Sequence, residues 1–331
     1  MLFVNVSHDK DIAEESYSNG NLIGTTDITN RNTLLKFLKL LDKSDNYAYI
    51  FLDIRFEDGI TTPADYALFN QISEMRDICY SRHSDIETLD NVASDKATIN
   101  NAFATTLTSF TRYQFLQDGE ESVPLKIFKE TDSLHRTIHK HGVFYTFDGQ
   151  LCYNSPFLCI PEDFYHDHDV NGEQNYYDLG PVLLNPELVD DEMLECLTDN
   201  KIIIVGDFVN DRHDTYRGPQ PGSYIIYLAY KSLVSRNNAV SWGYVILMLL
   251  VYSVISFTII TKKNIFVILG FNKFIKSKIG IFILDIIGYS FVLTTISVIT
   301  YLAFGIASNV VLPSLVFAVL AFVVNLKKIY K

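Results

Sequence analysis

Residues 241–260 read SWGYVILMLLVYSVISFTII, and this stretch decides the architecture of the chain. It contains no charged residue, and a transmembrane helix needs about 20 consecutive apolar residues to cross the hydrocarbon layer. Two further apolar stretches follow at residues 281–304 and 310–324. The sequence therefore predicts a membrane anchor of three closely spaced helices in residues 239–331, preceded by a large domain in residues 1–238.

The lysines of the C-terminal part predict how these helices are oriented. The whole chain has a net charge of −12, but residues 239–331 contain eight lysines and one acid, so they carry +7 and residues 1–238 carry −19. The lysines follow the first and third apolar stretches, at Lys262, Lys263, Lys273, Lys276, Lys278, Lys327, Lys328 and Lys331. Three spans place these two segments on one face, and short cytoplasmic loops are rich in lysine. We therefore predict a multi-pass protein of the cell inner (plasma) membrane, with its acidic domain outside the cytoplasm.

The acidic charge limits the partners of the large domain. Nucleic acids and anionic lipid headgroups are bound by clusters of lysine and arginine, so a charge of −19 argues against both. Residues 1–7, MLFVNVS, lack the basic flank and apolar core of a signal peptide. Because an acidic domain of this size needs a signal to cross a membrane, we expect a further apolar helix upstream.

The large domain has the pattern of an α/β fold. Residues 2–6, 47–56 and 201–208 are nearly continuous apolar runs, as expected for strands that are covered on both faces. Residues 31–41 place leucines at helical spacing, and residues 63–75 begin with a proline in the expected first turn. The alternation predicts a mostly parallel central sheet covered by helices.

The remaining segments predict an insertion and a short junction. Residues 81–200 are rich in Asn, Asp, Gly and Pro, and we interpret them as a possible insertion, with a hairpin at 142–153 that turns on Asp148-Gly149. A helix is expected after Gly222. Only a few residues then precede the first apolar stretch, and a short junction of this kind transmits displacement better than a flexible tether does.

Several segments together resemble one family. They are DITNR at 27–31, YIFLDIRFE at 49–57, Asp65 in the following helix, and KIIIVGDFVNDRHDTYRGPQPGSYIIYLAY at 201–230, with the three apolar stretches behind them. Over nearly its whole length the chain is similar to the CHASE domain, type two, the extracellular sensory module of bacterial histidine kinases, nucleotide cyclases and protein kinases. The resemblance implies one membrane helix before the domain, three after it and then an effector, where this sequence has only KKIYK.

The first candidate site is the segment after the last apolar strand. Asp207, Asp211, His213 and Asp214 follow that strand, and ligand sites of α/β sheets lie beyond the carboxyl ends of strands. Carboxylate and imidazole groups at this density could hold a divalent ion or contact another ligand. The alternative is that the carboxylates accept hydrogen bonds from loop amides, as Asx side chains do in turns. Residues 218–222 are expected to form a rigid turn that leads into the next helix.

The second candidate group is Asp27, Arg31, Asp53 and Asp65. Asp53 lies within an otherwise apolar strand, and burying a carboxylate is costly unless it is paired. Arg31 or Arg55 is the available partner. A structural ion pair is therefore favoured over a catalytic acid, and no nucleophile and base occur at a recognisable spacing.

Histidines form two weaker candidate sites. Among His135, His139 and His141, two imidazoles lie four residues apart and would share a helix face if the segment were helical, and His166 and His168 lie in the acidic run YHDHD. Either group could bind a transition metal, but neither has the motif that makes a zinc assignment specific, and solvated loop histidines are the alternative.

These patterns predict a membrane-anchored, extracytoplasmic sensory or ligand-binding domain that is not an enzyme and needs no cofactor. Its expected partners are the lipid bilayer, a small-molecule or peptide ligand, and a cytoplasmic or membrane signalling protein. No nucleic acid is expected among them. The alternative is a divalent-metal-binding protein or enzyme that acts at residues 207–214.

Overall fold

The chain divides into two compact units, Met1–Asn238 and Ala239–Lys331. A computed structural model describes residues 1–16, 22–56, 60–82, 92–100, 103–106, 109–161, 164, 176–184, 191–261, 278–304 and 310–326. Most of the lysines that predict the orientation, and also His166 and His168, lie outside these residues. Each unit is described separately below.

The first unit is built on a six-stranded sheet in which every strand pairing is parallel. In spatial order the strands are β14 (Tyr177–Asp178), β1 (Leu2–Asn5), β15 (Ile202–Gly206), β4 (Tyr49–Asp53), β5 (Ile78–Arg82) and β6 (Ala97–Ile99). The α/β prediction with a mostly parallel sheet is confirmed. Segment 81–200, interpreted as a possible insertion, supplies β6 and β14, the two edge strands.

The strands are continuously apolar because both of their faces are buried. In β4, Tyr49 and Phe51 point into one hydrophobic core, while Ile50 and Leu52 point into the other. Strands β1 and β15 alternate in the same way. A strand that is covered on both sides needs no polar face, which explains the uninterrupted apolar runs.

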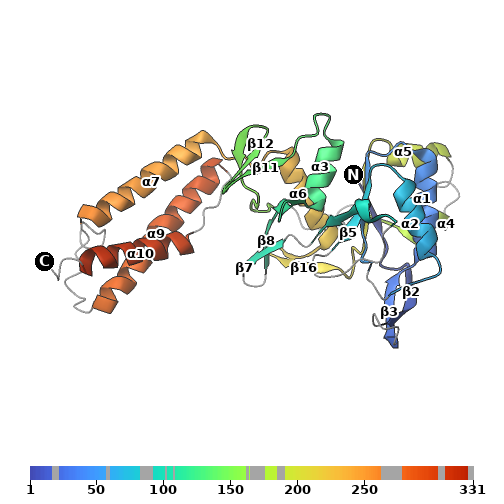
Figure 1. The fold of residues 1–331 in the computed structure, drawn as a ribbon, viewed down its shortest axis with the longest axis horizontal. Coiled ribbons are helices and arrows are strands. Elements are labelled where there is room, and N and C mark those ends of the chain that lie inside the picture. The colour runs from blue at the N-terminus through green and yellow to red at the C-terminus, as the bar shows by residue number, and fades with distance from the viewer. Residues whose placement is uncertain are drawn as a thin grey trace. The chain divides into compact units, whose positions relative to one another are not determined.

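Helices form a layer on each side of this sheet (Figure 1). One face is covered by α1 (Arg31–Ser44), α2 (Asp65–Glu74), α4 (Leu179–Leu184) and α5 (Asp191–Thr198), whose apolar side chains share one core. The other face is covered by α3 (Val123–Thr131) and α6 (Gly222–Val234). The sheet therefore lies in the middle layer, between the two cores.

The starts of α1 and α2 are set by polar side chains. Helix α1 begins as expected, because the side chain of Asn30 accepts a hydrogen bond from the backbone N–H of Thr33 at 3.0 Å. Helix α2 begins at Asp65, so the prediction of a start at Pro63 is wrong by two residues. The Asp65 carboxylate accepts a hydrogen bond from the N–H of Thr62 at 2.6 Å and closes a turn that contains the proline.

Smaller sheets surround this core. They are the hairpin β2–β3 (Lys10–Ser16 and Leu22–Thr29), the pair β9–β10 (Leu116–Gln117 and Glu120–Glu121), the sheet β11–β12–β13 (Ile138–His141, Phe144–Phe147 and Gln150–Cys152), and the sheet β7–β8–β16–β17 (Phe103–Thr106, Ser109–Tyr113, Arg212–Thr215 and Gly218–Pro221). The hairpin predicted at Asp148-Gly149 is confirmed. The simple turn expected at 218–222 is wrong, since Gly218–Pro221 pairs antiparallel with Arg212–Thr215 as a hairpin.

The second unit contains three apolar helices, α7 (Trp242–Thr261), α9 (Lys278–Phe304) and α10 (Val311–Leu326). By length and composition, α7 and the Phe282–Phe304 part of α9 could each cross a membrane. Helix α10 has 16 residues and spans about 24 Å, which is shorter than a hydrocarbon layer of about 30 Å. Many of their large apolar side chains are exposed, including Leu249, Phe291 and Leu302.

Candidate functional site

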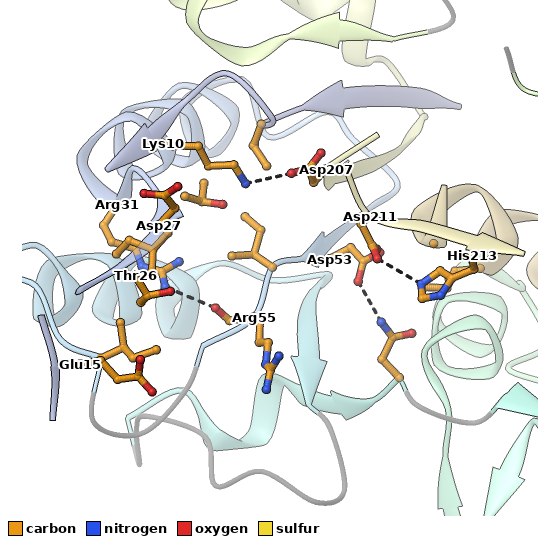
Figure 2. Close-up of a pocket in the computed structure, with 18 residues that line it drawn as sticks. Lys10, Glu15, Thr26, Asp27, Arg31, Asp53, Arg55, Asp207, Asp211 and His213 are labelled. Atoms are coloured by element: carbon orange, nitrogen blue, oxygen red, sulfur yellow. Dashed lines mark hydrogen bonds and ion pairs between the residues drawn. The ribbon is translucent and has the colours of Figure 1, made fainter. Parts of the chain in front are cut away.

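A pocket of about 530 Å³ lies at the carboxyl edge of the central sheet (Figure 2). The strand register explains its position, because Asn5 pairs with Gly206 and Gly206 pairs with Asp53, so β1, β15 and β4 end side by side. The loops after these strands line the pocket, together with the hairpin β2–β3 and the first turns of α1 and α6. Ligand sites of α/β sheets occupy this position, and their volumes commonly fall between about 300 and 1,000 Å³.

Six of the seven site residues predicted from the sequence line this pocket: Asp27, Arg31, Asp53, Asp207, Asp211 and His213. The two candidate groups, which are about 150 residues apart in the chain, therefore belong to one site. Asp214 is the exception. It is exposed on β16, where it pairs with Pro219 of β17, and it is not among the lining residues.

Asp53, at the end of β4, connects three elements through neutral donors. Its Oδ1 accepts hydrogen bonds from Ser81 Oγ at 2.9 Å and from Asn100 Nδ2 at 2.8 Å, and its Oδ2 accepts one from Ser223 Oγ at 2.7 Å. The expected ion pair with Arg31 or Arg55 is therefore wrong. Burial, together with the nearby charge of Asp211, raises the pKa of Asp53 to about 6.

The contact between Asp53 and α6 depends on a glycine at the end of β15. A Cβ added at Gly206 would lie 2.2 Å from Ser223 Oγ and 3.2 Å from Asp53 Cβ. Only a residue without a side chain allows the serine at the start of α6 to approach the end of β4 this closely.

Asp211 and His213 form an ion pair beside Asp53. His213 Nε2 lies 3.1 Å from Asp211 Oδ1, and the hydrogen bond to Asp211 raises the pKa of His213 despite the opposing effect of burial. The first residue of α6, Gly222, packs against this pair. A Cβ at that position would lie 2.5 Å from Asp211 Oδ2 and 3.0 Å from His213 Nε2.

Asp207 organises the loop that follows β15. Its Oδ1 accepts hydrogen bonds from the backbone N–H groups of Val209 and Asn210, so the interpretation as a loop carboxylate is confirmed for this residue. Its Oδ2 lies 2.9 Å from Lys10 Nζ. Burial opposes ionisation, but the hydrogen bonds from Asn210 and Lys10 bring the pKa of Asp207 below its ordinary value.

Arg31 lies on the other side of the pocket from Asp53, Asp211 and His213 (Figure 2). It is the first residue of α1 and is only 3 % exposed. Its Nε is 3.5 Å from Asp65 Oδ1, and its guanidinium carbon is 4.3 Å from the centre of the Phe56 ring. Burial lowers the pKa of Arg31 to about 10, so the side chain is still charged at neutral pH.

The sequence analysis missed Lys10, Ser81, Asn100 and Ser223. Lys10 starts a hairpin that was not predicted, and Asn100 follows a short strand in the segment that was hardest to interpret. Ser223 had a recognisable signal, because it directly follows Gly222 at the predicted start of a helix beside the first candidate group.

The metal hypotheses find no geometric support in the part of the chain that the structure describes. Within those residues, no three His, Cys, Asp or Glu side chains are placed to share one ion. His139 and His141 lie on strand β11, so the helical spacing considered for them is wrong. His135 lies in a turn, where its Nδ1 is 3.0 Å from the carbonyl oxygen of Lys129.

No family model, curated protein or solved structure matches this chain.

Proposed function

We propose that the chain is a membrane-anchored ligand-binding module of the sensory class, resembling the CHASE domain, type two, and that residues 1–238 lie outside the cytoplasm. The observation that carries the proposal is the pocket of about 530 Å³ at the carboxyl edge of a parallel sheet, in a chain that also has apolar helices of membrane-spanning length. The module binds a small molecule or peptide and passes its state to a signalling partner.

The polar groups of the pocket favour binding over catalysis. The imidazole of His213 is engaged with Asp211, and the hydroxyl of Ser223 donates to Asp53, so the serine is not aligned with the histidine as a nucleophile with its base. Lys10 is held by Asp207. This arrangement supplies oriented charges and hydrogen-bonding groups, which is what recognition of a polar ligand requires.

The exposed apolar surface of the second unit supports a membrane anchor. Side chains such as Leu249, Phe291 and Leu302 are between 61 % and 79 % exposed, and a soluble helical unit would bury such residues. We propose three spans that include α7, α9 and α10. The lysines of residues 262–278 and 327–331 then face the cytoplasm.

The course of the chain supports coupling between the pocket and the membrane. Gly222 and Ile226 line the pocket and belong to α6, which ends at Val234, and α7 begins at Trp242. If the domain has two conformations that present the first turns of α6 differently, a ligand binds one of them more tightly. The difference between its two affinities then sets how far it shifts the equilibrium toward that conformation. The short connection to α7 then carries the displacement toward the bilayer.

The proposal is tested by mapping which side of the membrane each unit occupies. Cys159 and Cys196 are exposed in the first unit, whereas Cys79 and Cys152 are buried. We expect a membrane-impermeant maleimide to label Cys159 and Cys196 in intact spheroplasts. Lys273→Cys, in a background where both exposed cysteines are serine, should be labelled only after permeabilisation. Labelling of Lys273→Cys in intact spheroplasts would overturn the proposed topology.

A further inference from the structure

The guanidinium of Arg31 is buried in the pocket wall without enough hydrogen-bond acceptors. Among the described residues, neither its Nε nor its Nη1 has a hydrogen-bond partner. Its Nη2 makes one long hydrogen bond, 3.4 Å, to the carbonyl oxygen of Arg55. Asp65 supplies a counter-charge at 3.5 Å, but buried N–H groups that lack an acceptor are costly, so the geometry indicates a further acceptor from outside the chain.

The chemistry of this acceptor follows from the shape of the guanidinium. Arginine presents parallel N–H groups in a planar fork that matches a carboxylate with two hydrogen bonds. The Phe56 ring covers the guanidinium at 4.3 Å and Asp65 approaches Nε, which leaves the two Nη groups of this pocket-lining residue for an external acceptor. A planar monoanion can accept a hydrogen bond from each of them.

The side of the pocket opposite Arg31 carries the carboxylates of Asp53 and Asp211. Asp53 and Asp211 lie there close enough that their charges interact, and His213 lies beside them, with its Nε2 3.1 Å from Asp211 Oδ1. The described lining residues of the whole pocket include five acids and three lysines or arginines; of the acids, Asp27 and Glu15 lie on the Arg31 side (Figure 2), and Asp207 is paired with Lys10. At the other end the two neighbouring carboxylates of Asp53 and Asp211 favour a ligand cation, and an ammonium group can donate hydrogen bonds to several carboxylate oxygens.

We propose, as a refinement of the ligand-binding function above and resting on it, that the pocket binds a zwitterion of the amino acid or short peptide class. The carboxylate of the ligand pairs with Arg31, and its ammonium group lies against Asp53 and Asp211. Figure 2 shows these two groups of residues facing each other across the pocket.

Ligands with one kind of charge fit this pocket less well. A phosphate ester would satisfy Arg31 but would bring a second negative charge toward the acidic side, where like charges repel. A simple amine would leave the Arg31 guanidinium without an acceptor, and a neutral sugar would compensate neither charge. The matched pair of opposite charges is what selects a zwitterion.

The first test compares ligands that differ only in their charged groups. The full chain in detergent micelles is screened by thermal unfolding against the 20 L-amino acids and a set of dipeptides, and each that binds is then compared with its N-acetyl and its C-amide derivative. At about 100 times its Kd, a ligand should raise Tm by several degrees. We expect at least one zwitterion to do so, with both derivatives binding at least about tenfold more weakly.

Three outcomes would overturn the proposal. They are no shift with any zwitterion, equal binding of the N-acetyl derivative, which would define a carboxylate site only, and equal binding of the amide, which would define an amine site only. The topology experiment reports independently on the proposed function. Labelling that places the first unit outside, combined with no zwitterion binding, would remove the ligand class but keep the anchored module.

The second test assigns the two ends of the ligand to residues. Arg31→Lys retains the charge but loses the fork, and we expect affinity for the zwitterion to fall at least about tenfold. Asp53→Asn should weaken binding of the zwitterion similarly, but should leave that of the N-acetyl derivative unchanged. Arg76→Lys is the matched control, because Arg76 is exposed and pairs with Asp45 away from the pocket. Unchanged affinity in both pocket variants would overturn the assignment even if a zwitterion binds.

Discussion

At the scale of single residues, Asp53 is the group on which the pocket is organised. Its three donors come from β5, from the end of β6 and from the start of α6, so one carboxylate joins segments that are up to 170 residues apart. The donors are neutral, and neutral hydrogen bonds only partly offset the cost of burying the charge. The raised pKa of Asp53 is the result.

This raised pKa predicts how stability depends on pH. The Asp53 contribution is fully present below the pKa of the unfolded chain, 3.8, and is lost as pH rises through the folded value of about 6. A shift of this size corresponds to at most about 3 kcal/mol of unfolding free energy. We expect Asp53→Asn to remove this fall between about pH 4 and pH 6 and to be no less stable than the wild type at pH 7.5.

Thermal unfolding followed by tyrosine circular dichroism can measure this, because 15 of the 20 tyrosines lie in the first unit and the one tryptophan does not. Asp214→Asn, which removes an exposed carboxylate from the neighbouring hairpin, is the control. If Asp53→Asn unfolds with the same pH dependence as the wild type, another group causes the fall in stability between about pH 4 and pH 6.

At the scale of elements, the position of α6 against the sheet depends on the absence of a side chain at Gly206. Gly206→Ala would place a methyl group 2.2 Å from Ser223 Oγ, and rotating the hydroxyl away would break its hydrogen bond to Asp53. We expect a loss of roughly 1–3 kcal/mol in unfolding free energy, as for other overpacked sites. Chemical denaturation of the full chain in detergent measures it.

Two further variants control this prediction. Gly24→Ala, in β3, meets no atom within 4 Å and should not destabilise the protein. In a Ser223→Ala background the clashing hydroxyl is absent. Gly206→Ala should therefore cost less unfolding free energy in that background than in the wild type. Equal effects of the two glycine substitutions would argue against the close approach of α6 to β15.

At the scale of the whole molecule, the two units should respond differently to the same substitution. Leu249 on α7 is 61 % exposed and Leu134 of the first unit is 72 % exposed. A lysine near the middle of a membrane helix costs about 2.5–3.5 kcal/mol on insertion scales, whereas a lysine on a soluble surface costs little. We expect Leu249→Lys to lower the fraction of protein that resists carbonate extraction from membranes, and Leu134→Lys to leave it unchanged. An equal response would contradict a lipid-facing α7.

Much of the fold could be predicted because its signals are local. The apolar runs of β1, β4 and β15, the leucine spacing of α1 and the Asp148-Gly149 turn all depend on residues within a few positions of one another. The errors have two causes. The strand at 218–221 pairs with nearby Arg212–Thr215, but its two prolines cannot donate to a strand ladder and hide it in the sequence. The partners of Asp53 were missed because the contacts are distant, with Ser223 170 residues away along the chain.

The sequence by itself determined the α/β class, the apolar helices and most of the candidate site residues, since residue type, periodicity and strand ends are read along the chain. Only the tertiary structure decided that the two candidate groups form one pocket, that Asp53 is bound by Ser81, Asn100 and Ser223, and that Arg31 pairs with Asp65. The physical reason is that parallel strands pair residues far apart in the chain, so their register, rather than any local pattern, determines which side chains meet at the edge of the sheet.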